Sequence, residues 1–228
     1  MSLEGILPLC KPKGKTSFHM VSLFRKITTV RKIGHAGTLD PFATGVLILL
    51  IGKSFTTLSD RFLTQDKAYL ATVRLGSATT TYDPEGEVTK TSAHIPTKEA
   101  IEQALPSFQG TILQTPPMFS AKKVAGKKLY ELARKGISIE RKAVPVTLHT
   151  TLVSYNYPDL ILHIECSKGT YIRSVASDLG ELLGCYAHLT ELVRTRSGRI
   201  TLENCCDPMQ CLDPSYNWQK YLCTLPPL

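Results

Sequence analysis

The segment GHAGTLDPFATG, residues 34–45, places a single carboxylate among side chains that could support chemistry. Asp40 is the one acidic residue between Glu4 and Asp60, whereas the same interval contains eight lysines and arginines. Neighbouring positive charges favour the ionised form of a carboxylate. Asp40 is therefore expected to be an anion, which could attack a carbon atom or stabilise positive charge developing on a sugar.

The residues around Asp40 leave both a structural and a functional interpretation open. An Asp-Pro pair often does no more than stabilise a turn. Glycines at 34, 37 and 45 would let another backbone or a ligand approach closely, and Thr38 adds a hydroxyl group. His35 is either a partly buried histidine with one hydrogen bond or a flat ring that lies near a base or sugar.

The positive charge of the chain is concentrated around this segment. The interval from Glu4 to Asp60, leaving out those two residues, carries a net charge of +7, and the chain of 228 residues carries +8. A local cationic field attracts polyanions, of which nucleic acid is the commonest. With 43% hydrophobic residues the chain can also form a proper core.

Two glycine-lysine motifs and the cysteines give no sign of a nucleotide or metal site. A phosphate-binding P-loop needs a glycine five residues before GKTS at 14–17 or GKS at 52–54, and those positions hold Leu9 and Leu47. No second acid lies within nineteen residues of Asp40, so we expect no metal there. The seven cysteines include no CxxC pair, which makes reduced cytosolic thiols a better interpretation than zinc ligands.

The hydrophobic pattern predicts the elements that position these residues. A helix is expected across residues 15–32, capped by Thr16 or Ser17, with Met20, Val21, Phe24, Ile27 and Val30 on one face. Strands are expected at 46–51, 68–77 and 160–166, a turn at 79–87, and helices at 97–105 and 171–183. The lysine-rich residues 114–136 form either a solvated amphipathic helix or, as we favour, a basic arm for a phosphate backbone.

The ordered motifs resemble those of the TruB-type bacterial tRNA pseudouridine synthases, which modify uridine 55 in the T-arm. The matching stretches cover residues 5 to about 200 in the family's order and are GILPLCKPKGKTS, GHAGTLDPFATGVLILLIGKSFT, KAYLATVRLGSATTTYDPEG, TPPMFSAKKVAGKKLYELARKG and KGTYIRSVASDLGELLGCYAHLTELVRTRSG. One departure is Thr80, where the family often has an acid, so that Asp83 is the only early acid of its loop.

The resemblance implies a cofactor-free, metal-free isomerisation with Asp40 as the nucleophile at C1′ of the sugar or C6 of the base. Tyr69 would stack on the target base, and Arg173 would pair with Asp40. The residues implied to bind substrate are His35, Gly37, Thr38, Tyr171, Lys11, Lys13, Lys122, Lys123, Tyr130 and Arg134. The alternative is a non-catalytic RNA-binding or RNA-folding module of the same fold.

The resemblance also implies an α+β fold, with a mixed, largely antiparallel sheet flanked by helices and an inserted basic arm. We expect one catalytic domain at 1–205, with the arm at about 107–145, and a short C-terminal extension at 206–228 in place of a full RNA-binding domain. The expected partner is the T-arm of tRNA. The sequence shows no secretory signal or membrane segment, and we expect a cytoplasmic monomer without an obligate protein partner.

Overall fold

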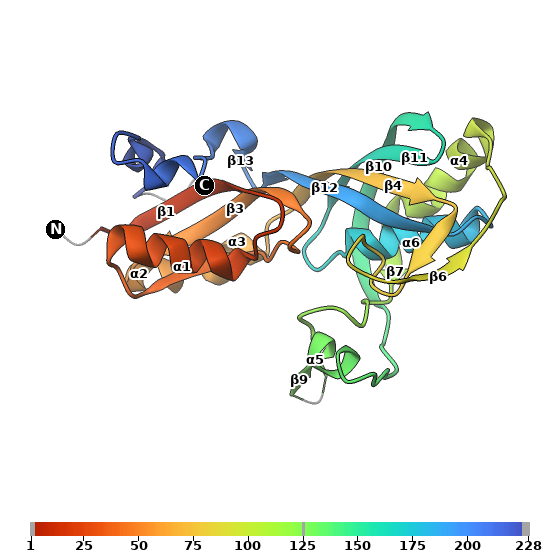
Figure 1. Cartoon of the computed structure of the whole chain (residues 1–228), viewed down its shortest axis with the longest axis horizontal. Helices are drawn as coiled ribbons and strands as arrows, with labels where there is room; N and C mark the ends of the chain where they lie inside the picture. Colours follow the sequence, from red (N-terminus) through yellow and green to blue (C-terminus); the bar gives the residue numbers. More distant parts are fainter. Residues whose placement is uncertain (1–2, 125, 225–228) are drawn as a thin grey trace. The chain divides into compact units, whose positions relative to one another are not determined.

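The computed structural model describes residues 3–124 and 126–224, a mixed α/β chain that divides into two compact units. Unit 1 contains residues 3–70 and 192–224, and unit 2 contains residues 71–124 and 126–191. The strands β4 (Lys67–Leu75) and β12 (Ala187–Ser197) each begin in one unit and end in the other. Figure 1 shows the elements of both units.

Unit 1 is built around the strand β3 (Thr44–Ile51). It pairs antiparallel with β1 (Gly5–Lys11) and β2 (Ile33–Ala36), and parallel with β12 at Val193–Thr44 and Arg194–Gly45. The short β13 (Ile200–Thr201) pairs with β12. All residues of β3 after Thr44 are buried, which confirms the buried strand that its apolar run predicts.

Both faces of β3 are buried because successive side chains point to opposite sides of a strand. Val46, Ile48 and Leu50 form one cluster with Phe62 of α3 (Ser59–Leu63). Leu47, Leu49 and Ile51 point to the other face and are also fully buried. A further short helix, α2 (Lys53–Thr56), follows β3 directly.

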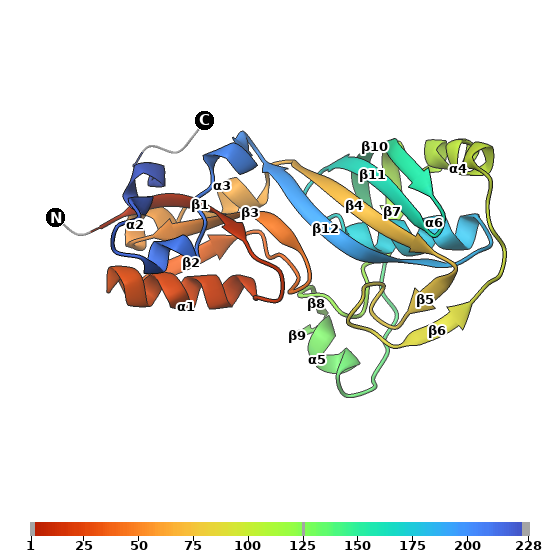
Figure 2. The same cartoon turned by 45° about the horizontal axis from the view of Figure 1, so that its top comes forward.

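The helix α1 (Ser17–Thr28) confirms the first predicted helix but is shorter than expected (Figure 2). Thr16 caps it by accepting a hydrogen bond from the main-chain N–H of His19. Met20, Val21 and Phe24 are buried. The helix stops at Thr28, and the C-cap residue Thr29 has a left-handed φ of 58°. The expected end at Arg31 and Lys32 was therefore wrong, because the αL residue turns the chain towards β2.

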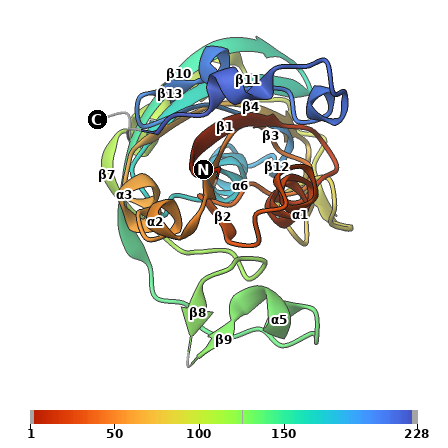
Figure 3. The ribbon, with the colours of Figure 1, turned by 90° about the vertical axis from the view of Figure 1, so that its left-hand side faces the viewer.

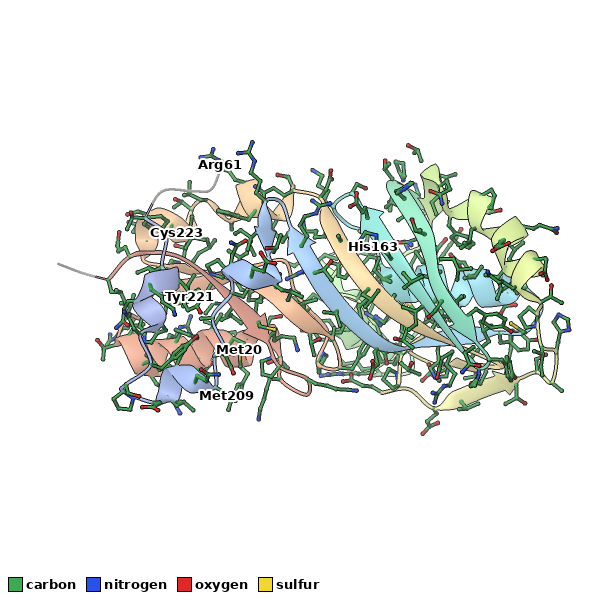
Figure 4. The ribbon with its side chains drawn as sticks, turned by 90° about the horizontal axis from the view of Figure 1, so that it is seen from above. Met20, Arg61, His163, Met209, Tyr221 and Cys223 are labelled. Atoms are coloured by element: carbon green, nitrogen blue, oxygen red, sulfur yellow. The ribbon has the colours of Figure 1, made fainter. Side chains whose placement is uncertain are left out.

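The segment after β13 crosses unit 1 in three short 3-10 helices, η2 (Leu202–Asn204), η3 (Gln210–Leu212) and η4 (Trp218–Tyr221). Isolated bridges join Leu9 to Cys206 and Ile6 to Cys223, which Figure 4 labels. Trp218 packs edge to face on Phe24 of α1, with ring centroids 5.6 Å apart. The irregular segment therefore covers part of the core of unit 1.

Unit 2 contains strands in the order β4, β11 (Asp159–Cys166), β10 (Val144–Asn156) and β7 (Gly110–Gln114). The pairs of β10 with β11 and with β7 are antiparallel. On β11, buried and half-buried residues alternate along the strand. The helix α6 (Ile172–Leu182) lies against one face of these strands (Figure 3) and buries Ile172, Val175, Ala176 and Leu179.

The remaining elements of unit 2 follow the predicted turns and helix. The hairpin of β5 (Ser77–Thr79) and β6 (Val88–Thr91) encloses the predicted turn. The helix α4 (Lys98–Ala104), capped by Thr97, stops before Pro106 as predicted and continues as the 3-10 helix η1 (Leu105–Phe108).

The arm lies outside the sheet of unit 2, as Figure 3 shows. Within the expected range of 107–145, the residues Gly110–Gln114 form β7 and Val144 begins β10, so the part outside the sheet is 115–143. The arm contains β8 (Lys123–Val124), β9 (Lys127–Lys128) and α5 (Leu129–Ala133). Residue 125 of the expected arm, and residues 1–2 and 225–228 of the expected domains, lie outside the described residues.

The α+β class with a largely antiparallel sheet is confirmed. The domain boundaries at 205 and 206 stay a prediction. Across residues 3–124 and 126–224, no helix is long and apolar enough to cross a membrane.

Candidate active site

Asp40 lies in the loop between β2 and β3, at residues 37–43, which we call the aspartate loop. The buried Ser17 at the start of α1 holds the middle of this loop: its Oγ donates to the Leu39 carbonyl at 3.1 Å and accepts from the Leu39 N–H at 2.9 Å. Within the loop, the Ala43 N–H donates to the Asp40 carbonyl at 3.1 Å. The residue beside the carboxylate is therefore fixed to the neighbouring helix.

Two buried cations bind the main chain of the aspartate loop on either side of Asp40. Lys11 is fully buried, and its Nζ donates to the carbonyls of Lys15 at 2.6 Å and Pro41 at 3.2 Å. Arg194 is 1% exposed, and its Nη2 donates to the Gly37 carbonyl at 2.9 Å. Its Nε donates to the Val46 carbonyl at 2.6 Å. Both cations thus donate to main-chain oxygens on either side of Asp40.

Two glycines of the motif allow this packing. Gly45 has a φ of +98°, and a Cβ there would collide with the main chain of Arg194. Gly37 has a φ of +80°, and a Cβ there would lie 3.2 Å from Arg194 Nη1. The sequence predicts that another backbone or a ligand comes close to these glycines. At Gly45 the backbone of β12 comes close, and at Gly37 the Arg194 guanidinium does.

His35 lies on β2 with one ring nitrogen sealed from water. Its Nδ1 is buried and has no hydrogen-bond partner among the described residues. Burial lowers the pKa of His35 below its usual value of 6.5, and the positive charge of Arg194 lowers it further. Because its pKa lies below 6.5, the ring is mostly neutral at pH 7.

Tyr69 lies on β4 and is buried, with 8% of its surface exposed. Two residues earlier on the same strand, and hence on the same side of it, the buried Lys67 donates to the Leu63 carbonyl at 2.8 Å. This bond joins the start of β4 to the end of α3.

In unit 2, Arg173 lies in the first turn of α6 and is 5% exposed. Its Nη1 lies 3.3 Å from Asp83 Oδ2 and donates to the Thr81 carbonyl at 3.0 Å. Its Nη2 donates to the Phe119 carbonyl in the arm at 2.8 Å. The guanidinium therefore joins the turn after β5 to the root of the arm.

Asp83 is a residue that the sequence reasoning did not assign to the site. It is 3% exposed, and its Oδ1 accepts from the Glu85 N–H at 3.0 Å and from the Thr81 hydroxyl. A buried acid opposite a buried guanidinium stabilises both charges. The sequence does contain one sign of its importance, because Asp83 is the only early acid of the predicted turn at 79–87.

Tyr171 is the N-cap residue of α6 and is bound by the amide of Gln114, the last residue of β7. The Tyr171 N–H donates to Gln114 Oε1 at 2.8 Å, and Gln114 Nε2 donates to the Tyr171 carbonyl at 3.1 Å. The Ser174 hydroxyl donates to the Thr115 carbonyl at 3.3 Å. The start of the arm is thus attached to the first turn of α6.

The arm combines positive charge with the aromatic ring of Tyr130. Residues 115–143 contain eight lysines and arginines against two glutamates. Lys128 Nζ and Arg134 Cζ each lie 5.4 Å from the centroid of the Tyr130 ring. Lys123 is exposed and Lys122 half-buried. Clusters of lysine and arginine beside an aromatic ring are typical of surfaces that bind nucleic acid, and the role of this cluster stays a prediction.

The site residues expected from the sequence fall into both units. Unit 1 holds Lys11, Lys13, His35, Gly37, Thr38, Asp40 and Tyr69, whereas unit 2 holds Lys122, Lys123, Tyr130, Arg134, Tyr171 and Arg173. The aspartate loop brings Gly37, Thr38 and Asp40 together and receives the bond from Lys11. The pairing of Asp40 with Arg173 stays a prediction.

The C-terminal cysteines were the open alternative for a metal. Cys206 and Cys211 are buried thiols with Sγ atoms 3.9 Å apart. Burial raises the pKa of Cys205 to about 12, so this thiol stays protonated. Within the part of the chain that the structure describes, no three histidine, cysteine or acidic side chains form a group that could hold a metal ion.

Two family models match the chain. The N-terminal domain of the TruB family pseudouridylate synthases matches residues 25–172, which is more than half of the chain. The tRNA pseudouridylate synthase B C-terminal domain matches residues 173–224. The chain belongs to the TruB family of pseudouridylate synthases.

Relatives with a described function support this assignment. A TruB-family protein of Protochlamydia amoebophila, described as tRNA pseudouridine synthase B, is 62% identical over 203 residues, which are 89% of this chain and 78% of that protein. A protein of Chlamydia trachomatis serovar L2 with the same description is 51% identical over 221 residues, or 97% of this chain and 92% of the relative.

Solved structures extend the likeness to the fold. A chain in the crystal structure of a Cbf5-Nop10-Gar1 complex matches with a TM-score of 0.73 and 28% identity, over 95% of this chain. A chain in an H/ACA RNP bound to a substrate RNA containing 2′-deoxyuridine matches with a TM-score of 0.69 and 26% identity. This TruB-family chain spans 56% and 55% of those two chains.

Proposed function

We propose that this TruB-family chain isomerises uridine 55 in the T-arm of tRNA to pseudouridine. The observation that carries the proposal is the 51% identity to a protein described as tRNA pseudouridine synthase B, over nearly the whole length of both chains. The site supports it, because one acidic residue lies in a loop fixed by hydrogen bonds from the buried side chains of Ser17 and Arg194. An isomerisation needs no co-reactant.

In the proposed reaction the bond between N1 of uracil and C1′ of ribose breaks, the base rotates, and C5 joins C1′. Asp40 acts as the nucleophile, at C1′ or at C6 of the ring, and is released when the new bond has formed. The proton on C5 leaves to the solvent, and N1, which has lost its bond to ribose, takes up a proton, so the composition of the nucleotide is unchanged. Tyr69 stacks on the target base, and Arg173 pairs with Asp40 to keep it ionised.

The target base must leave its stack to reach Asp40, which costs a few kcal/mol. Phosphate contacts offset that cost, and the arm supplies the side chains for them: Lys122, Lys123, Tyr130 and Arg134. Lys11, Lys13, His35, Gly37, Thr38 and Tyr171 complete the proposed substrate-binding set. The chain acts as a cytoplasmic monomer, with tRNA as its partner.

The test is the release of tritium from T-arm stem-loops labelled at C5 of uridine. We expect release of the label from position 55 only, and no release when that position is cytidine. RNA binding is measured in parallel by filter retention. Binding without release would favour the RNA-binding module of the same fold over the isomerase.

A further inference from the structure

Arg194 is a buried cation whose hydrogen bonds reach both flanks of the aspartate loop. Its guanidinium donates to the Gly37 carbonyl, three residues before Asp40, and to the Val46 carbonyl, six residues after it. Both acceptors are main-chain carbonyl oxygens. One planar group therefore sets the spacing between the start of the aspartate loop and the strand that follows it.

The packing around Arg194 leaves little freedom for this arrangement. The main chain of Arg194 lies against Gly45, and its guanidinium lies against Gly37. Both glycines have positive φ angles, of +98° and +80°. Because any other residue would be strained in that conformation, the close contact depends on glycine at both positions.

Burying a guanidinium has a cost in free energy that burying an apolar side chain does not have. Removing a charge from water costs several kcal/mol, and an apolar side chain of similar volume avoids that cost. What Arg194 adds over such a side chain is two fixed hydrogen bonds and a positive charge. The positive charge of Arg194 also acts close to the aspartate loop, because it lowers the pKa of His35 on the strand before the loop.

We propose that Arg194 is a positioning residue for Asp40, which fixes the aspartate loop from behind through Gly37 and Val46 and adds a positive charge that favours the carboxylate. The proposal rests on the proposed function of Asp40 as the nucleophile. Arg194 does not contact the substrate in this account. Its loss should slow the chemical step and leave tRNA binding intact.

The experiment measures single-turnover tritium release at saturating tRNA, the tRNA dissociation constant and thermal unfolding for Arg194→Met and Arg194→Lys. A displacement of about 1 Å at a reacting group costs roughly 10²-fold in rate, and we expect a loss of that size for Arg194→Met. Lysine keeps the charge, so Arg194→Lys should recover part of the rate. The dissociation constant should change by less than about threefold in both variants.

Gly37→Ala provides a second variant if Arg194→Met does not fold. Its Cβ would press on the guanidinium while leaving Arg194 in the chain, so it should lower the single-turnover rate at saturating tRNA, where a change in affinity does not limit the rate. Arg199→Met, an exposed arginine near the end of the same strand, is the matched control and should keep the native rate.

Native rates in Arg194→Met or Gly37→Ala, or a loss confined to tRNA affinity, would overturn the inference. A complete lack of rescue by lysine in a folded Arg194→Lys protein would also overturn it. The proposed function is tested separately in the same assay, because native protein that releases no tritium would refute the isomerase itself.

Discussion

The aspartate loop and the arm are both irregular segments of the site, but they are held in opposite ways. The aspartate loop is fixed by Ser17, Lys11 and Arg194, which are all buried and which bond to its main chain. The arm keeps most of its cationic side chains at the surface, and its described bonds to Arg173 and Ser174 lie at its root.

The difference matches two separate tasks. A nucleophile needs a fixed direction, because a small displacement from the reacting atom is costly in rate. A phosphate backbone needs charges at the surface that can adjust to its path. Changes in the loop should therefore alter the chemical step, and changes in the arm should alter RNA affinity.

The largest effect is expected at the root of the arm, at the ion pair of Asp83 with Arg173, whose Nη2 also bonds to the Phe119 carbonyl. Asp83→Asn removes the negative charge of Asp83 from beside this buried guanidinium. The free energy of unfolding should fall by about 3–5 kcal/mol, as measured by urea denaturation.

Asp159→Asn is the matched control for this pair. Arg74 and Asp159 form an ion pair at 3.0 Å with 47% and 38% of their side-chain surfaces exposed. Solvent screening reduces such a pair to less than about 1 kcal/mol. Equal losses in both variants would contradict a special role for the buried pair.

Ser17→Ala should have the next largest effect, because it leaves the N–H and carbonyl of the buried Leu39 without their partner. We expect a loss of about 2 kcal/mol in unfolding free energy and a slower chemical step at saturating tRNA. Ser54→Ala removes an exposed bond to Glu4 and should leave both quantities unchanged. A drop in tRNA affinity alone would contradict the comparison.

The arm is tested by Lys122→Gln combined with Lys123→Gln. Each lost phosphate contact reduces the slope of log affinity against log salt by about 1, so the pair should reduce it by about 2. The single-turnover rate at saturating tRNA should stay native. Lys98→Gln, an exposed change outside the arm, serves as the control.

His35 gives the smallest effect, on the pH dependence of stability. Its pKa in the folded protein lies below 6.5, so the unfolded chain binds a proton more readily as pH falls below 6.5. The contribution of neutral His35 is present above pH 6.5 and is lost as pH falls towards the folded pKa. Urea unfolding at pH 7.5 and 5.5 should show a smaller decrease for His35→Gln than for the native protein.

The sequence predicted the elements of the site better than the contacts between them. Apolar periodicity and caps located α1, β3, α4 and α6, because each of these elements buries one regular set of side chains. The end of α1 was missed, since an αL conformation at Thr29 carries no strong sequence signal.

The partners of the buried cations could not be read from the sequence. Arg194 lies 157 residues after Gly37, and Arg173 lies 90 residues after Asp83. Such contacts depend on the strand order of the folded chain, which local patterns do not encode. The glycines at 37 and 45 did predict a close approach, but not that Arg194 would be the residue that approaches.

The most direct test of the account compares the native protein with Asp40→Asn and with Asp60→Asn, an exposed acid of α3, in single-turnover tritium release and tRNA binding. We expect native binding by all three proteins and a loss of release of at least about 10³-fold in Asp40→Asn alone. Release by Asp40→Asn at the native rate would contradict the assignment of Asp40 as the nucleophile.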